Sequence, residues 1–265
     1  MNVKAKKKYG QNFLKDESIK QKIIQAMPND NLKVVEIGPG LGDLTKKLLE
    51  NKKDITAFEI DLELCEILQN SFKSEIEKKQ LKLVCSDVLD KWDENSLVRE
   101  EYHLIANLPY YVATNIILKA LADNRCKTVL VMIQKEVALK FSASPGDKEF
   151  SSLSILASII GESNLLFDVG GDCFDPPPKV TSSVLKIVKN KDYTSLFKEK
   201  DEFDKFKSFL KTAFTQPRKT LLKNLQQGYS KEKVISWLEK NNLSKTLRPH
   251  QLSTSDYHLL FKNLK

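Results

Sequence analysis

The chain has 265 residues, of which 41% are hydrophobic and 29% charged, as expected for a folded protein with one large and one smaller domain. No apolar run approaches the roughly 18 residues of a membrane span, and the first residues lack the apolar stretch of a signal peptide. We therefore expect a cytoplasmic protein that binds no membrane. The four cysteines and three histidines show no metal-ligand spacing, which predicts free thiols and no metal site.

The net charge of +8 is unevenly distributed. Residues 1–185 carry 25 lysines and arginines against 27 acids, whereas residues 186–265 carry 18 against 8. A basic segment, residues 1–15, contains the closely spaced Lys4, Lys6, Lys7 and Lys8. Basic charge gathered at both ends of the chain indicates a polyanionic partner, with nucleic acid the leading candidate. Solvated helix faces are the alternative interpretation.

Short apolar runs alternate with helical patterns through the first two thirds of the chain. We predict strands at Lys33–Ile37, Ile55–Ile60, Leu81–Cys85, Tyr102–Ala106 and Thr128–Ile133. Helices are predicted between them, for example at Leu44–Leu49 and Leu62–Phe72. This alternation is typical of βαβ units in a doubly wound, mostly parallel α/β sheet. A later β-rich run, Thr181–Val188, is expected to close the sheet as an antiparallel edge.

Beyond residue 189 the pattern becomes helical. The predicted helices are Phe203–Phe214, Arg218–Leu225, Lys231–Lys240 and Asp256–Leu260. Pro217, Gly228 and the pair Asn241-Asn242 separate them. We therefore predict two domains, an α/β domain at residues 1–189 and a small all-helical domain at residues 190–265.

A glycine-rich turn, Gly38-Pro39-Gly40-Leu41-Gly42, follows the first predicted strand. Its glycines let a ligand approach the backbone at a helix amino terminus, where N–H groups are free. Glu59 ends the second strand, where a carboxylate can bind the hydroxyls of a ribose. Asp87 follows the third strand, where it can meet an adenine amine. Because parallel strands end at one edge of the sheet, we expect these residues to surround a single crevice.

Asn107-Leu108-Pro109-Tyr110 follows the fourth predicted strand and completes this row. The Asn107 side-chain oxygen and the Leu108 carbonyl can accept both hydrogens of an exocyclic amine. Pro109 fixes the turn, and Tyr110 offers a flat face for stacking. A nicotinamide enzyme would explain the glycines and the first acid, but not this tetrapeptide. The set resembles a class I methyltransferase that uses S-adenosylmethionine (SAM).

Motifs along nearly the whole chain, and their order, resemble the KsgA/Dim family of rRNA adenine dimethyltransferases. They are Tyr9–Leu14, Glu36–Leu41, Asn107–Tyr110, Gln134–Val137, Phe174–Val180 and Ala213–Leu221. The resemblance implies an enzyme that uses SAM to place two methyl groups on each of two adjacent adenosines. Their exocyclic amines lie in a hairpin near the 3′ end of small-subunit (16S) rRNA. We expect a monomer that contributes to biogenesis of the small ribosomal subunit.

Carried over by motif, the resemblance implies that the cofactor is bound by Asn12, Leu14, Gly38, Gly40, Glu59, Asp87 and Asn107. Asn12 and Leu14 are expected to line the cofactor entrance. Gly38 is expected under the methionine moiety, and Asn107 between the methyl donor and the target. Glu59 and Asp87 keep the ribose and adenine roles already given.

The target base must leave its stack to reach such a pocket. Tyr110 and Phe174 are expected to hold its two faces, with each stacking contact contributing about 1–3 kcal/mol. No strong base is needed if both amine hydrogens are accepted, because the nitrogen lone pair then turns toward the methyl group. The predicted RNA-binding residues of the helical domain are Arg218, Lys219, Lys223 and Arg248.

Two positions depart from the family pattern: Tyr111 stands where Asn is common, and Ser158 where Gln is common. Both bear on the shape of the target pocket. Two other functions compete with this interpretation. A related family methylates 23S rRNA and confers macrolide resistance, and a non-catalytic RNA-binding assembly factor would keep the fold alone. The triple proline and the Ala213–Leu221 segment favour the small-subunit enzyme, and the intact strand-end residues favour an active one.

Overall fold

The computed structural model describes residues 5–92, 96–197 and 200–265, so Lys4 lies outside the described residues. Contacts divide the chain into two compact units. Unit 1 comprises Met1–Ala138 and Asn164–Lys189, and unit 2 comprises Leu139–Ser163 and Asn190–Lys265. Residues 139–163, which the sequence placed in the α/β domain, thus group with the carboxyl-terminal helices. Within unit 2, Gly146 N donates to the His250 carbonyl at 2.8 Å, and the rings of Phe150 and Phe214 lie 6.2 Å apart.

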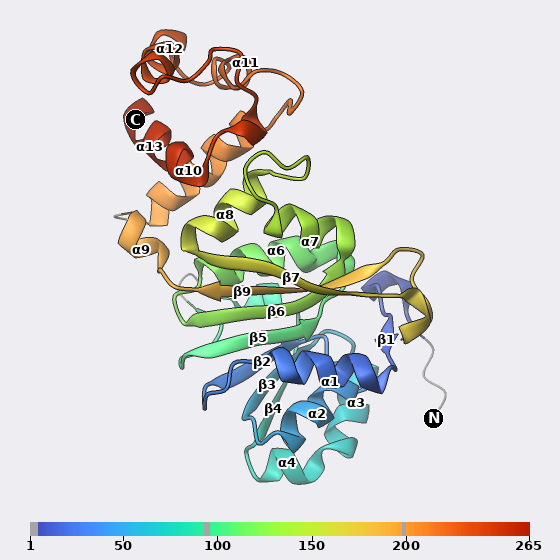
Figure 1. Ribbon diagram of the computed structural model, residues 1–265. Coiled ribbons are helices and arrows are strands. Elements are labelled where there is room, and N and C mark those ends of the chain that lie inside the picture. The colour runs from blue at the N-terminus through green and yellow to red at the C-terminus, as the bar shows by residue number, and fades with distance from the viewer. Residues whose placement is uncertain (1–4, 93–95, 198–199) are drawn as a thin grey trace. The chain divides into compact units, whose positions relative to one another are not determined.

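A seven-stranded sheet with strand order β4-β3-β2-β5-β6-β9-β7 carries unit 1 (Figure 1). Its strands are β2 (Lys33–Ile37), β3 (Ile55–Glu59), β4 (Leu81–Cys85), β5 (Tyr102–Asn107), β6 (Cys126–Gln134), β7 (Gly161–Val169) and β9 (Ser182–Lys189). The pairs from β4 through β6 are all parallel, whereas β9 runs antiparallel to β6. The five predicted strands and their doubly wound arrangement are confirmed.

One prediction for the sheet is wrong: β9 is antiparallel, but it is not the edge. β7 lies beyond it. Exposed and more buried side chains alternate along β7, the period of a strand with one covered face. Three polar residues, Glu162, Ser163 and Asn164, follow Gly161 at the start of this strand and hide its apolar alternation in the sequence. A further short pair joins β1 (Phe13–Leu14) to β8 (Phe174–Asp175), antiparallel.

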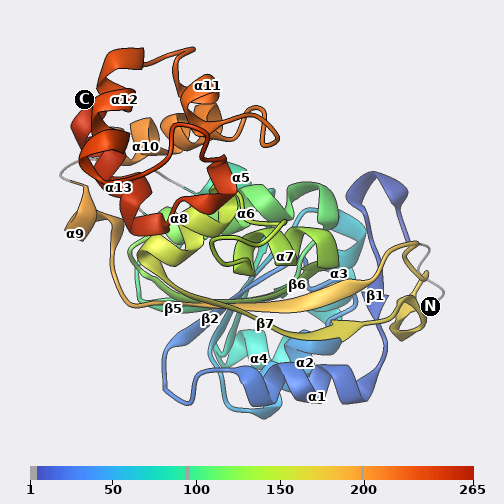
Figure 2. The ribbon, with the colours of Figure 1, turned by 45° about the horizontal axis from the view of Figure 1, so that its top comes forward.

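The helices of the first 142 residues include the expected crossovers between strands. They are η1 (Lys7–Tyr9), α1 (Glu17–Ala26), α2 (Asp43–Glu50), α3 (Leu62–Ser71), α4 (Lys73–Glu77), α5 (Val88–Lys91), α6 (Tyr110–Ala122) and α7 (Lys135–Ser142). Figure 2 shows α1 and α2 on one face of the sheet and α6 on the other. The Asp16 side chain caps α1 by accepting from Ile19 N at 3.0 Å.

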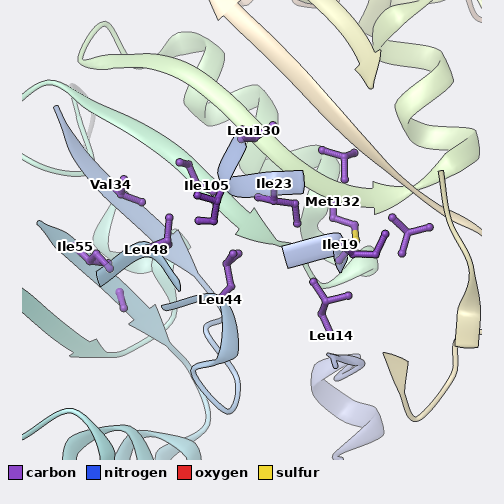
Figure 3. Packing of buried hydrophobic residues seen from close by; sticks show 14 of the residues in the cluster. Leu14, Ile19, Ile23, Val34, Leu44, Leu48, Ile55, Ile105, Leu130 and Met132 are labelled. Atoms are coloured by element: carbon purple, nitrogen blue, oxygen red, sulfur yellow. The ribbon is translucent and has the colours of Figure 1, made fainter. Parts of the chain in front are cut away.

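The core beneath α1 and α2 is formed by aliphatic side chains from several elements (Figure 3). Ile19 and Ile23, four residues apart on α1, face Leu44 and Leu48 of α2, which have the same spacing. Val34 of β2 and its neighbours on β3 and β5 supply the sheet side of this cluster. This packing holds the carboxyl ends of the central strands in fixed positions.

Unit 2 is helical. Its helices are the end of α7, α8 (Ser152–Ile160), α9 (Tyr193–Leu196), α10 (Lys200–Ala213), α11 (Leu221–Leu225), α12 (Lys231–Lys240), η3 (Pro249–Gln251) and α13 (Thr254–Leu264). Aromatic rings form its core: the Phe206 ring lies 5.2 Å from the rings of Phe197 and Phe261. The helix predicted from Arg218 begins only at Leu221, because Thr220 caps it.

Cys65 of α3 and Cys85 at the end of β4 form a disulfide, with Cα atoms 6.0 Å apart. The expectation of four free thiols is therefore wrong for this pair. Residues 20 positions apart give no short-range motif, and only the packing of α3 beside β4 brings them together. Cys126 and Cys173 are free. In the described part of the chain, no helix combines the length and the apolar character needed to cross a bilayer.

Candidate active site

A pocket in unit 1 lies where β2 separates β3 from β5, the point at which the strand order reverses. Open α/β sheets bind ligands at such a reversal, outside the carboxyl ends of the strands. All seven residues expected to bind the cofactor line this pocket: Asn12, Leu14, Gly38, Gly40, Glu59, Asp87 and Asn107. Leu108, Pro109 and Tyr110 line it as well. The structure thus brings together residues that are up to 98 positions apart in the chain.

The glycine-rich turn between β2 and α2 needs its glycines. Gly38, Gly40 and Gly42 have φ values of 66°, 62° and 86°, in the left-handed region. A Cβ atom at Gly40 would lie 3.0 Å from Cδ1 of Phe13, so a larger residue would also crowd the pocket wall. The turn leads directly into α2, which begins at Asp43. Its backbone can therefore lie close to a bound ligand.

Glu59 is held at the end of β3 by backbone donors. Its Oε2 accepts from Gly40 N at 3.2 Å, and its Oε1 accepts from Asp61 N at 2.9 Å. Only 4% of the residue is exposed, and this burial raises the pKa of the carboxyl above its ordinary value. The carboxylate is fixed in place and lines the pocket, as a group that accepts from two ribose hydroxyls must be.

Glu36 also lines the pocket, and sequence reasoning assigned no role to this second acid. It precedes the glycine turn on β2 and is 1% exposed. Thr45 of α2 donates to its Oε2 at 2.7 Å. Burial, with the nearby charge of Glu59, raises the pKa of Glu36 to about 8. The available signal was its place, an acid in the central strand β2, two residues before the first glycine of the turn.

Asp87 ends the turn after β4 and caps α5. Its Oδ1 accepts from Leu89 N at 2.9 Å, which fixes the carboxylate at the pocket wall. Its second oxygen is the one that can accept from an adenine amine. The short helix that follows, Val88–Lys91, depends on this cap.

Asn107 ends β5, and its amide is oriented by the amino-terminal segment. Its Nδ2 donates to the Asn12 carbonyl at 3.0 Å, so its Oδ1 is the atom left to accept from a ligand. Leu108 has a buried side chain, 1% exposed, and its N–H donates to the Met132 carbonyl at 3.1 Å. Leu108 can therefore contribute to the pocket chemistry through its backbone carbonyl.

Pro109 and Tyr110 begin α6. Pro109 occupies the cap position, and Tyr110 is the first helical residue. The Tyr110 hydroxyl and the Ser182 hydroxyl of β9 lie 2.6 Å apart, and burial raises the pKa of the tyrosine. The phenol is thus anchored to the sheet while the ring lines the pocket. A ring fixed in this way can stack on a base without losing further conformational freedom.

Phe174 occupies a different environment from the one expected. It is 1% exposed, belongs to the hydrophobic core, and is not among the described residues that line the pocket. On β8 it pairs with Leu14 of β1, which does line the pocket. A base could stack on Phe174 only after its ring is uncovered. In this structure, Phe174 supports the pocket wall through Leu14.

The two positions that depart from the family pattern belong to different units. Tyr111 is 62% exposed and lines the pocket, and its ring would be 3.4 Å from a Cβ atom on Gly10. It therefore borders the amino-terminal segment. Ser158 lies on α8 in unit 2, where its hydroxyl is 2.7 Å from that of Thr254. Among the described residues, Ser158 is not part of the pocket lining.

A second candidate site, for RNA, lies on the surface of unit 2. Arg218 and Lys219 occupy the loop before α11, Lys223 lies on that helix, and all three are exposed, as is Arg248. A backbone hydrogen bond from Leu221 N to the Leu247 carbonyl, 2.7 Å, brings the two chain segments together. The four predicted basic residues therefore come from adjoining segments.

Buried Asn224 organises the loop that carries Arg218 and Lys219. Its Oδ1 accepts from Gln216 N at 2.8 Å, and its Nδ2 donates to the carbonyls of Gln216 and Thr220, both at 3.1 Å.

Among the described residues, no group of three or more His, Cys, Asp or Glu side chains is placed to hold a metal ion.

The fold, the glycine turn and the row of strand-end residues define a class I SAM-dependent methyltransferase. The pocket fits SAM by the chemistry of its groups: glycine backbone, acids for ribose and adenine, and an amide beside them. The crystal structure of the 23S rRNA methyltransferase ErmE matches with a TM-score of 0.72 at 23% identity, over 96% of this chain and 99% of that one. A dimethyladenosine transferase from Plasmodium falciparum matches with a TM-score of 0.73 at 24% identity, over 94% and 95%. At these identities the likeness concerns the fold.

The chain belongs to the family described as Ribosomal RNA adenine dimethylase, whose sequence pattern matches residues 2–265. It is 55% identical to the Ribosomal RNA small subunit methyltransferase A of Sulfurimonas denitrificans, over 98% of this chain and 94% of the relative. The protein of the same name from Campylobacter curvus is 53% identical, over 99% and 93%. The family resemblance expected from the motifs is confirmed.

Proposed function

We propose that this protein dimethylates the exocyclic amines of two adjacent adenosines in a hairpin near the 3′ end of 16S rRNA, during biogenesis of the small ribosomal subunit. The observation that carries the proposal is the position of Asn107, whose amide nitrogen is held by Asn12 while its oxygen remains available in the pocket. The small-subunit methyltransferases at 53–55% identity support the choice of substrate. Such a substrate would place the protein in the cytoplasm.

The cofactor half of the pocket is assigned to the strand ends of β2, β3 and β4. Gly38 and Gly40 bring backbone close to the methionine moiety, Glu59 accepts from the ribose hydroxyls, and Asp87 accepts from the adenine amine. Asn12 and Leu14 border the entrance from the amino-terminal side. When bound, SAM supplies a methyl group on a positively charged sulfur.

The target half is assigned to the loop after β5. Asn107 Oδ1 and the Leu108 carbonyl accept the two hydrogens of the adenine amine, which directs the nitrogen lone pair away from the ring. Pro109 sets the direction of the loop, and the Tyr110 ring stacks on the base after it leaves the RNA helix. Holding the groups in this geometry provides the catalysis, so no strong base is required.

Unit 2 is assigned to binding of the rRNA. Arg218, Lys219, Lys223 and Arg248 are exposed on adjoining segments and carry the charge that phosphates require. A folded RNA is bound mainly through its shape and phosphates, which suits a basic helical surface. One RNA needs one active site and one basic surface, both present in a single chain, so we propose a monomer.

The test is transfer of labelled methyl groups from SAM to immature small subunits, with large-subunit rRNA as the competing substrate. The expected result is four methyl groups per small subunit, on two adjacent adenosines, and none on the large-subunit rRNA. Transfer to the large-subunit rRNA would favour a macrolide-resistance-type enzyme. Tight RNA binding without transfer to either substrate would favour a non-catalytic assembly factor.

A further inference from the structure

Asp61, two residues beyond Glu59, has a buried side chain with no role in the site described above. The residue is 3% exposed, and it is not among the described residues that line the pocket. Its carboxylate nevertheless accepts two long-range hydrogen bonds. Lys6 Nζ lies 2.7 Å from Oδ1, and Gln11 Nε2 lies 3.0 Å from Oδ2. The partners Lys6 and Gln11 are 55 and 50 positions away in the sequence. The buried carboxylate therefore holds a distant segment of the chain in place.

The segment it fixes is Lys6–Leu14, here called the amino-terminal strap. The strap is closed on itself, because Gln11 Oε1 accepts from Lys6 N at 2.7 Å. Every residue from Tyr9 to Leu14 lines the pocket. The far end of the strap is anchored by the pairing of β1 with β8. Asp61 therefore supplies the anchor at the near end, and the pocket lies between the two anchors.

The same residue also fixes the ribose-binding acid. Asp61 N donates to Glu59 Oε1 at 2.9 Å, so one residue holds both a pocket carboxylate and the strap beside it. Burial by itself would raise the pKa of Asp61, but the hydrogen bonds from Lys6 and Gln11 outweigh it and bring the pKa below its ordinary value. The carboxylate is thus charged at neutral pH and forms an ion pair with Lys6.

We propose that Asp61 is a positioning residue for the cofactor: through Lys6 and Gln11 it holds the amino-terminal strap against the pocket, in the conformation that binds SAM. This inference rests on the proposed assignment of the pocket to SAM. With the strap pinned in advance, binding does not have to order nine residues of chain. The predicted effect therefore appears in the KM for SAM, and the rate at saturating SAM changes little.

Asp61 has a second role that must be separated from this one. Its Oδ1 caps α3 by accepting from Glu63 N at 3.2 Å. Serine is an equally good cap, but its side chain is too short to reach the partners on the strap. Asp61→Ser therefore releases the strap and keeps the cap. Lys6→Met releases the ion pairs of Lys6 with Asp61 and Glu63 and leaves the cap of α3 in place.

Steady-state methyl transfer is measured for Asp61→Ser, Lys6→Met and the double variant, with thermal unfolding of each. We expect the KM for SAM to rise about ten-fold in Asp61→Ser, with kcat and the unfolding temperature near those of the unchanged protein. Lys6→Met is expected to raise the KM for SAM less, because Gln11 still donates to Asp61. The double variant should resemble Asp61→Ser alone, because Asp61→Ser already removes the contact between Lys6 and Asp61.

Glu63→Gln is the matched control, since Glu63 pairs with Lys6 at 2.7 Å but has a side chain 57% exposed. It should leave the KM for SAM unchanged. If Asp61→Ser and Lys6→Met also leave it unchanged while Glu59→Gln raises it, the proposal for Asp61 is wrong and the SAM pocket stands. If Glu59→Gln has no effect either, the assignment of the pocket is wrong. A loss of thermal stability alone would reduce Asp61 to a helix cap.

Discussion

The pocket of unit 1 contains buried acidic side chains, whereas the basic surface of unit 2 consists of exposed lysine and arginine side chains. In the pocket, Glu36 and Glu59 are 1% and 4% exposed, and each accepts hydrogen bonds of defined length from the protein. On the basic surface, Arg218 and Lys219 are exposed, and each carries its charge at the end of a long, flexible side chain. What is fixed there is the backbone of the loop, through Asn224.

The difference follows from what each region is proposed to do. Methyl transfer depends on sub-ångström placement of acceptors around one amine, so the groups that perform it are held rigidly. Binding of phosphates depends mainly on the amount and place of positive charge. Changes in the pocket should therefore reduce the rate or cofactor binding sharply, and changes on the basic surface should act gradually and depend on salt.

The largest effect is expected for Asn107→Ala. Loss of one acceptor for the amine should lower kcat by about 10²–10³-fold or more, while affinity for the rRNA stays within about two-fold, because the basic surface is intact. Single-turnover transfer and filter binding measure the two quantities. Tyr110→Phe, which removes only the hydroxyl contact with Ser182, should cost a few-fold in rate. Undiminished transfer by Asn107→Ala would refute the assigned chemistry.

The next largest effect is expected for Glu59→Gln. The ribose would lose a charged acceptor, and hydrogen bonds to charged groups contribute about 1.5–3 kcal/mol. We expect the KM for SAM to rise about 10–100-fold, measured at saturating rRNA. SAM analogues that lack the adenosine should give the same KM with Glu59→Gln as with the unchanged protein. A loss of kcat without a change in KM would show that Glu59 acts on the reaction and not on cofactor binding.

A smaller effect is expected from the double change Arg218→Ala and Lys219→Ala. Removing each phosphate contact should lower the slope of log affinity against log salt by about 0.7–0.9. At saturating rRNA, kcat should equal that of the unchanged protein. Lys231→Ala with Lys233→Ala removes the same charge from exposed positions of α12 and serves as the control. Equal losses in both double variants would make the effect one of net charge alone.

The last prediction concerns stability rather than activity, and it depends on the pH and on Glu36. Its pKa rises from the ordinary 4.5 to about 8 on folding. Between these two pH values the folded protein keeps a proton that the unfolded chain has released. This contribution to stability is complete below pH 4.5 and is lost as the pH rises to about 8. Glu36→Gln removes it, so unfolding temperatures at pH 5 and pH 8 should converge. An unchanged difference between them would contradict the assigned pKa.

The strand-end rule was enough to predict the pocket from the sequence. Glu59, Asp87 and Asn107 each follow an apolar run of recognisable length, and parallel strands must end at one edge. The basic surface was predictable only as charge: Arg218 and Lys219 were placed on a helix, but they lie in the loop before it. Thr220 can cap a helix that starts at Leu221, and it can also lie within a helix that starts at Arg218. The sequence is therefore compatible with either start.

What the sequence could not reveal depends on contacts between distant segments. The anchoring of Lys6 and Gln11 by Asp61 joins positions 55 and 50 residues apart. The burial of Phe174 depends on its pairing with the short strand β1. The disulfide between Cys65 and Cys85 depends on the packing of α3 beside β4. None of these has a periodic pattern, and each needs the tertiary structure.

The most direct test of the proposed function is primer extension on 16S rRNA from a strain that lacks this gene. Dimethylated adenosines block reverse transcriptase, because the modified amine cannot pair. The block at the adenosine pair near the 3′ end should disappear in the deletion strain. It should return with the unchanged gene and not with Asn107→Ala. Persistence of the block in the deletion strain would contradict the proposed function.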